Sequence, residues 1–414
     1  MAAVLSKEVR QALQDIYYNE RTGRGREAFA LLERASQAGD GDASCVLARC
    51  LCGYQYVWRG HGFPEDDDRA ISLLHKSVEQ GSALGVLVAL RSGELTPSLE
   101  KRMPFESLQA AFSEAEALAE GGDAFSQYVV GNAYFWWDFL RIQNKGADSF
   151  SSPAAFKAYL KENISKCEDW FWKAFRGGVY FAANNLNQYY TKGDEDIIAP
   201  QPEKAKGLWK IGAECGHPLH QSFYADELKE AERYEEALHW YKEAAEGGNF
   251  NDWYEVGHMY WEGLGTEKDP AYAVSCYERE LARDPDHMGG NNHLGRAYFL
   301  GQGVPQDYAK AFHYLSVAHD KKGSKWGALY LAKCCFYGLG APQDYAKALQ
   351  FLGEVSWNNQ EADYMRGCIY AQGLGVPADI KRGVEYLQKA GNFAKAREEL
   401  LHYKKTLFGK WVRR

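Results

Sequence analysis

The chain of 414 residues lacks the features that would assign it to a membrane, to export or to nucleic acid. No stretch approaches the roughly 20 uncharged apolar residues of a membrane-spanning helix. The first residues carry charge from Lys7 onward and have no apolar core, so they do not resemble a signal peptide. Asp and Glu number 56 against 48 Lys and Arg, a net charge of -8. Because nucleic-acid binding needs a basic surface, nucleic acid is not an expected partner.

The cysteines indicate the cellular compartment of the protein, and the basic residues form one cluster that needs an interpretation. The nine cysteines are an odd number and do not recur at one place in the repeats described below. They predict reduced thiols and a cytoplasmic protein. One basic cluster stands out near the C-terminal end, at Lys404, Lys405, Lys410, Arg413 and Arg414. We interpret it as a solvated tail, with contact to a membrane or an acidic partner as the alternative.

Sequence patterns of catalysis and metal binding are also lacking. The chain has no His-Glu-x-x-His, no Gly-x-Ser-x-Gly and no Gly-Lys-Ser/Thr phosphate loop. His217 and His220 are the closest histidine pair, and their spacing alone is weak evidence for a metal. Packing inside a helix is the favoured interpretation of a second candidate set, Cys45, Cys50, Cys52 and His61. We therefore predict no catalytic residue, no metal ligand and no cofactor.

One motif recurs in the C-terminal half. A Gly-x-Gly begins at Gly263, Gly301, Gly338 and Gly373, at distances of 38, 37 and 35 residues. An aspartate stands four residues after each second glycine, at Asp269, Asp307, Asp344 and Asp379. A small residue follows four positions later, at Ala273, Ala311, Ala348 and Gly383. Such a fixed period is typical of a repeat protein.

Each part of the motif has a mechanical role. Glycine accepts the left-handed conformation that ends a helix, and aspartate caps the first turn of the next helix. The residues that follow are apolar at helical spacing, as in Ala311, Phe312 and Leu315. Small residues such as Gly295 and Ala311 let the two helices approach closely. The motif therefore predicts antiparallel helix pairs.

The pattern small-x-x-Tyr-x-x-Gly-x-Gly-Val-x-x-Asp-x-x-x-Ala resembles the Sel1-like repeat family, a branch of the tetratricopeptide superfamily. The resemblance is clear from Asn251 to about Gly391, and residues 303–307 reproduce the motif fully. Cys335 and Thr266 depart from it at packing positions. The resemblance implies an all-α fold: an α-solenoid, coiled as a right-handed superhelix, of about nine antiparallel helix pairs.

The N-terminal half carries degenerate copies. Residues 60–66 keep the spacing from glycine to aspartate, and Gly131 begins a copy interrupted before a second helix near Trp170. We divide the chain into degenerate repeats at 1–123, further degenerate repeats at 124–249 with an insertion near 140–163, and regular repeats at 250–391. A capping helix, roughly Phe393 to Leu407, and the basic tail complete the chain at 392–414.

The first helix of each pair lines the inner surface of such a solenoid. The position after its small residue is polar in six of seven repeats: Arg49, Asn132, Gln188, His258, Arg296, Lys333 and Cys368. Aromatic and amide residues stand one turn away, including Tyr128, Phe135 and Phe336. In tetratricopeptide relatives these registers hold a bound peptide. The resemblance thus implies a partner-binding groove made of Asn132, Asn184, Gln188, Tyr254, His258, Trp261, Asn292, Arg296, Phe299, Lys333 and Tyr364.

Two interpretations of these groove residues stay open: they bind a partner, or the aromatic ones pack between repeats and the polar ones are only solvated. The favoured function is a non-enzymatic scaffold or adaptor for a protein or peptide partner. One alternative is a hydrolase or small-molecule-binding repeat protein, with the insertion from Leu140 to Asn163 over one end of the groove. Another is a bacterial regulator or immunity-type inhibitor built on the same scaffold.

Overall fold

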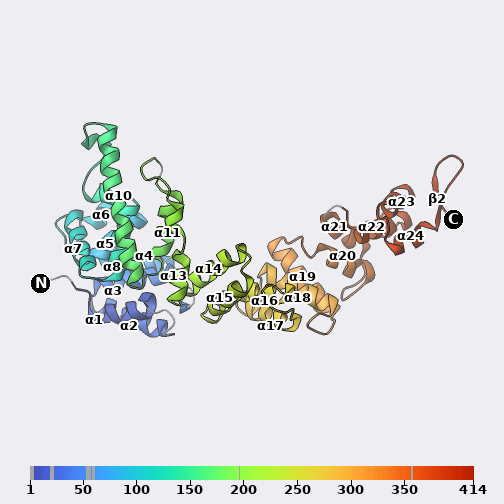
Figure 1. Cartoon of the computed structure of the whole chain (residues 1–414), viewed down its shortest axis with the longest axis horizontal. Coiled ribbons are helices and arrows are strands. Elements are labelled where there is room, and N and C mark those ends of the chain that lie inside the picture. The colour runs from blue at the N-terminus through green and yellow to red at the C-terminus, as the bar shows by residue number, and fades with distance from the viewer. Residues whose placement is uncertain (1–3, 19–22, 53–56, 58–60, 195, 356–357) are drawn as a thin grey trace. The chain divides into compact units, whose positions relative to one another are not determined.

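The computed structural model describes residues 4–18, 23–52, 57, 61–194, 196–355 and 358–414. The chain divides into two compact units, Met1–Tyr224 (unit 1) and Ala225–Arg414 (unit 2). Helices dominate the described residues of both units, and a single two-stranded sheet lies near the C-terminal end (Figure 1). The predicted all-α repeat fold is confirmed.

Unit 1 contains helices of very different lengths. They are α1 (Lys7–Leu13) with a π-helical turn (Gln14–Tyr18), α2 (Gly25–Gln37), α3 (Gly41–Leu51), α4 (Asp67–Glu79), α5 (Ala83–Ser92), α6 (Pro97–Glu100), α7 (Leu108–Glu120), α8 (Ala124–Phe135), α9 (Asp138–Ile142), a 3₁₀ turn (Ala147–Ser149), α10 (Pro153–Arg176), α11 (Ala182–Lys192), α12 (Pro202–Ala205) and α13 (Leu208–Glu214). The boundary between the units falls inside α14 (Pro218–Glu230). Paired helices include α3 with α4, α5 with α7, and α8 with α10.

Unit 2 is more regular. It contains α15 (Tyr234–Glu246), α16 (Asp252–Glu262), α17 (Pro270–Leu281), α18 (Met288–Leu300), α19 (Tyr308–Lys322), α20 (Ala328–Tyr337), α21 (Tyr345–Glu354), α22 (Gln360–Gln372), α23 (Ile380–Lys389), α24 (Ala394–Leu400), β1 (Tyr403–Lys405) and β2 (Trp411–Arg413). Helices α16 to α23 pack as four successive pairs, each a first and a second helix.

The turns of unit 2 have the predicted structure. The four leading glycines end the first helices in the left-handed conformation, with φ between +65° and +75°. Each following aspartate caps the second helix; the Asp344 carboxylate accepts the backbone N–H of Lys347 at 2.9 Å. A Cβ added to Gly295 would lie 2.5 Å from Leu315 Cγ, so the pair does depend on a small residue there.

The second glycine of each turn joins successive repeats. At Gly340 φ is +69°, and an added Cβ would lie 2.1 Å from the carbonyl oxygen of Tyr308, in the second helix of the preceding pair. Gly303 meets the carbonyl of Pro270 in the same way, at 2.3 Å. Two requirements therefore select glycine here: the left-handed backbone and contact with the preceding repeat.

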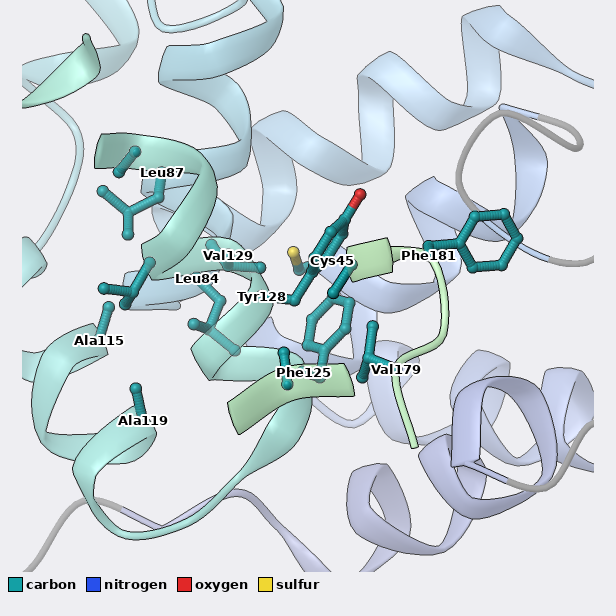
Figure 2. Packing of buried hydrophobic residues seen from close by; sticks show 14 of the residues in the cluster. Cys45, Leu84, Leu87, Ala115, Ala119, Phe125, Tyr128, Val129, Val179 and Phe181 are labelled. Carbon is teal, nitrogen blue, oxygen red and sulfur yellow. The ribbon is translucent and has the colours of Figure 1, made fainter. Parts of the chain in front are cut away.

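Unit 1 has one continuous apolar cluster that runs from Leu5 to Leu208. Figure 2 shows part of it, including Phe125, Tyr128 and Val129 of α8 and Leu84 of α5. Large aromatic side chains hold the centre; Phe171 of α10 is fully buried, with its ring 5.8 Å from that of Phe135. Of the degenerate copy at 60–66, Gly60 lies outside the described residues, and Asp66 caps α4 as expected from its spacing.

The insertion near 140–163 forms structure of its own. Its first part is α9 and a 3₁₀ turn, and its last part begins α10, which runs for 24 residues to Arg176. Phe150 and Phe139 pack on Tyr159, with ring centroids 4.9 and 5.8 Å apart. The insertion thus extends the second helix of the α8–α10 pair and adds a small aromatic cluster beside it.

The predicted capping helix from Phe393 to Leu407 is wrong in its second half. Helix α24 ends at Leu400, and the basic segment forms an antiparallel hairpin with Tyr403 opposite Arg413. Aromatic and β-branched residues on either side of the Thr406–Lys410 turn favour strands over a helix. Gly409, at φ +75°, allows the chain to reverse.

Candidate functional site

Three predicted groove residues of unit 2, His258, Phe299 and Lys333, each contact a residue of the next repeat. The rings of His258 on α16 and His293 on α18 lie 5.7 Å apart, and those of Phe299 on α18 and Tyr330 on α20 lie 5.0 Å apart. On α20, Lys333 forms an ion pair of 2.5 Å with Glu361 of α22. These contacts link the first helices of successive repeats.

Arg296 is the most distinctive of these residues. Its guanidinium carbon lies 5.3 Å from the ring centre of Trp261 and 5.9 Å from that of Trp326, and its side chain is 30% exposed. Its one ion pair within the described residues is a long contact of 4.0 Å with Glu262. The two indole rings hold the Arg296 guanidinium in place, and the long ion pair with Glu262 neutralises only part of its charge.

Trp326 was not among the predicted site residues. It lies in the connection between α19 and α20, outside the first-helix register, and is 49% exposed. Its ring is 5.3 Å from that of His293. A tryptophan in a segment rich in lysine, Lys321-Lys322-Gly-Ser-Lys325-Trp326, was the available sequence signal.

Buried polar groups surround Arg296. His293 stacks on Tyr277 at 5.0 Å, and burial, aided by the charges of His258 and Arg296, lowers the pKa of His293 to about 4. The imidazole is therefore neutral at pH 7. Among the described residues, Nδ1 of His258, Nδ1 of His293 and Oδ1 of Asn292 are buried without a hydrogen-bond partner.

Several predicted groove residues are covered by protein. Trp261, Phe299 and Asn292 are buried, as are Arg49 and Cys368, each of which follows the small residue of its repeat. At Arg49 and Cys368, two of the seven positions that follow a small residue, the side chain is therefore enclosed by protein. Packing between repeats was the open alternative for the aromatic residues. Partial exposure remains at Tyr254, His258, Arg296, Lys333 and Tyr364.

In unit 1 the residues at the corresponding repeat positions form hydrogen bonds through side-chain amides. Asn132 accepts a hydrogen bond from Asn185 of α11 at 2.7 Å and donates one to the carbonyl of Tyr128 at 2.9 Å. Asn184 and Gln188 of α11 are half-buried. Arg49 donates to the hydroxyl of Tyr17 at 3.2 Å. These residues join α3, α8 and α11 to their neighbours.

A cavity of about 490 Å³ lies beside this register, among α3, α4, α5 and α8. Its walls are largely apolar, with Leu74, Leu87 and Val129 among them, and charged groups surround them. Arg91 pairs with Asp138 at 3.2 Å, and burial raises the pKa of that carboxyl to about 6 despite the arginine.

Most of the histidines and cysteines weighed as metal ligands are buried: His217, His220, Cys45, Cys50 and His61. The His217 and His220 rings are buried with centroids 4.4 Å apart, and burial lowers the pKa of His217 to about 3. Burial also raises the pKa of the Cys45 thiol to about 12, which favours the protonated thiol at pH 7. Among the described residues no group of three or more His, Cys, Asp or Glu is placed to hold a metal ion.

No described helix is both long and apolar enough to cross a membrane.

Helix pairs closed by Gly-x-Gly turns, each resting on the previous pair, define a tandem helical-repeat protein. The Sel1 repeat model matches residues 25–40, 46–82, 180–217, 231–249, 254–279, 290–318, 327–353 and 360–392. The chain therefore belongs to the Sel1 repeat family. The match at 25–40 lies outside the copies identified from the sequence pattern, and the matched ranges leave out 83–179.

Two solved structures are similar in fold. One is a protective antigen present in uropathogenic Escherichia coli strains that displays an SLR fold; identity is 17%, the alignment covers 90% of this chain and 89% of that one, and the TM-score is 0.44. The other is a Sel1 repeat protein from Oxalobacter formigenes, with 18% identity, 96% and 94% coverage and a TM-score of 0.41.

Proposed function

We propose that this protein is a non-enzymatic scaffold or adaptor that binds a segment of a partner protein on the first-helix surface of unit 2, at Arg296 and Trp326. The observation that carries the proposal is the half-exposed indole of Trp326 beside a guanidinium that makes only one long ion pair within the described residues. Tryptophan and arginine are the residues most enriched among binding hot spots.

The surroundings favour a segment that combines a carboxylate with an apolar side chain. Arg296 offers a preorganised cation, and Trp326 offers an apolar face next to it. Lys321, Lys322 and Lys325 are exposed and make no ion pair within the described part of the chain. An acidic residue of the partner would be attracted by this charge, and an apolar neighbour would cover the indole.

The test is capture of a partner from cells that express the protein, with a photo-crosslinking amino acid at Leu300 on the exposed end of α18. Arg296→Ala and Trp326→Ala should each weaken binding of the identified partner by at least about ten-fold. Trp136→Ala is the matched control: Trp136 is 43% exposed and stacks at 5.1 Å on Arg91, which is already paired with Asp138. Binding unchanged by both unit 2 variants would refute the proposal.

A second candidate function is binding of a small molecule, and the cavity of unit 1 favours it. Its 490 Å³ falls within the range of about 300 to 1,000 Å³ typical of ligand sites. A thermal-shift screen of metabolites should then find a stabilising compound, worth about 3 kcal/mol at one hundred times its Kd. Val88→Trp, which fills the cavity, should abolish the shift. Turnover of that compound would instead indicate a hydrolase.

A regulator or an immunity-type inhibitor would be a special case of the scaffold. It would use the same surface of unit 2 and would differ only in the protein that it captures. Measuring the activity of the captured partner with and without this protein would distinguish regulation from assembly. Loss of the effect in Arg296→Ala would assign it to the same surface.

A further inference from the structure

The turn of the C-terminal hairpin places two large apolar side chains in solvent. Leu407 is 103% exposed and Phe408 is 97% exposed, the highest values among the exposed large apolar residues of the described chain. The turn is well defined by its hydrogen bonds. The N–H of Thr406 donates to the carbonyl of Lys410 at 2.8 Å, and the N–H of Lys410 donates to the Thr406 hydroxyl at 3.1 Å. The apolar pair is therefore held at the apex.

The base of the hairpin is anchored to the last helices. Tyr403 is buried, and its hydroxyl donates to Glu399 of α24 at 3.1 Å. Trp411 of β2 packs against the apolar cluster of α22 and α23. Figure 1 shows the turn standing clear of α23 and α24. The anchored base and the projecting apex make the exposure of Leu407 and Phe408 a property of the fold.

Basic residues surround this apex. Residues 401–414 contain Lys404, Lys405, Lys410, Arg413 and Arg414 and no acidic residue, in a chain whose net charge is -8. All five basic side chains are exposed. Leu407 and Phe408 thus lie at the apex, and exposed basic side chains follow along both strands, from Lys405 beside the turn to Arg413 opposite Tyr403 at the base.

We propose that this hairpin docks on an anionic lipid surface. Leu407 and Phe408 would enter the boundary between headgroups and acyl chains, and the basic side chains would contact the lipid phosphates. This docking goes beyond the proposed scaffold, since it would bring the partner bound at Arg296 to a membrane.

The order of groups along the hairpin favours a lipid surface over an acidic protein. Protein hot spots lie within larger patches that exclude water around them. Here the exposed apolar surface of the turn is limited to two adjacent side chains, and most other exposed residues of the hairpin are basic. A bilayer matches this arrangement because its apolar interior and its anionic headgroups are layered in the same order.

The test is co-flotation of the full chain with phosphatidylcholine vesicles, with and without phosphatidylserine. We expect binding that requires phosphatidylserine and weakens as salt is raised. Leu407→Asn and Phe408→Asn should each reduce the partition coefficient at least about ten-fold. Lys410→Gln should reduce it about five-fold.

Leu401→Asn is the matched control, because Leu401 is 66% exposed but lies outside the turn. It should leave vesicle binding unchanged, and circular dichroism should show that every variant is folded. Absence of vesicle binding, or binding that Leu407→Asn and Phe408→Asn leave intact, would overturn the proposal. Retention on immobilised polyglutamate without vesicle binding would overturn it in favour of an acidic protein. None of these outcomes bears on the partner surface of α18.

Discussion

The two units reach similar helix pairs by different physical means. In unit 2 the chain reverses at Gly-x-Gly turns with an aspartate cap, and apolar residues form separate clusters, one centred on α18 and one on α22. In unit 1 the helices begin at serine as well as aspartate caps, such as Ser82, Ser107 and Asp123, and one apolar cluster extends through the unit. Regular repeats therefore have their stability divided among neighbours, whereas the irregular unit depends on a shared core.

The comparison explains why the motif could erode in unit 1. A turn motif stabilises a repeat locally, and its loss must be offset elsewhere. Unit 1 has an aromatic centre that includes Phe125, Phe139 and Phe171, each fully buried. The sharpest test of this difference is to damage each unit by its own mechanism and to compare how far the damage spreads.

The largest effect is expected from Phe171→Ala in unit 1. Removing a fully buried ring leaves a cavity and should lower the free energy of unfolding by about 4 kcal/mol. Hydrogen exchange should show faster amide exchange across α5, α8 and α11 together. Leu352→Ala in unit 2 is the counterpart, and its effect should stay within α20 to α22. Equally local effects for both variants would contradict the comparison.

Gly340→Ala should destabilise unit 2 by about 3 kcal/mol, through left-handed strain together with the clash against the Tyr308 carbonyl. Gly323 separates the two contributions. Its φ is +67°, but nothing lies within 4 Å of an added Cβ, so Gly323→Ala should cost only about 1 kcal/mol. Denaturant unfolding of the two variants measures the difference. Equal losses would show that conformation alone, and not contact between repeats, selects glycine.

Protonation of His293 at acidic pH should lower the free energy of unfolding of unit 2, by less than Gly340→Ala does. The pKa of His293 is about 4 in the folded protein and 6.5 when unfolded, so the unfolded state binds more protons between these values. Stability therefore falls as pH is lowered through this window, by about 2 kcal/mol between pH 7 and pH 5. His293→Gln should remove this part of the pH dependence in thermal melts of unit 2. A variant that keeps the full dependence would assign it to other groups.

Prediction of the candidate site from sequence was partial. The register of Arg296 and Lys333 could be read because the repeat fixes which helix face each residue occupies. Whether that face is open depends on how closely the first helices approach, and sequence periodicity carries no such distance. Trp326 was not predicted because it lies in the connection between α19 and α20, where the repeat does not define a helix face.

The sequence by itself determined the helix pairs of unit 2, since glycine and aspartate act on the backbone within a few residues of themselves. It also determined that Lys404 to Arg414 would be a basic segment. The tertiary structure decided that Trp261 and Phe299 are packed between repeats, that unit 1 shares one core, and that the basic segment is a hairpin with Leu407 and Phe408 at its apex. These outcomes depend on contacts between residues far apart in the chain, and local patterns do not encode such contacts.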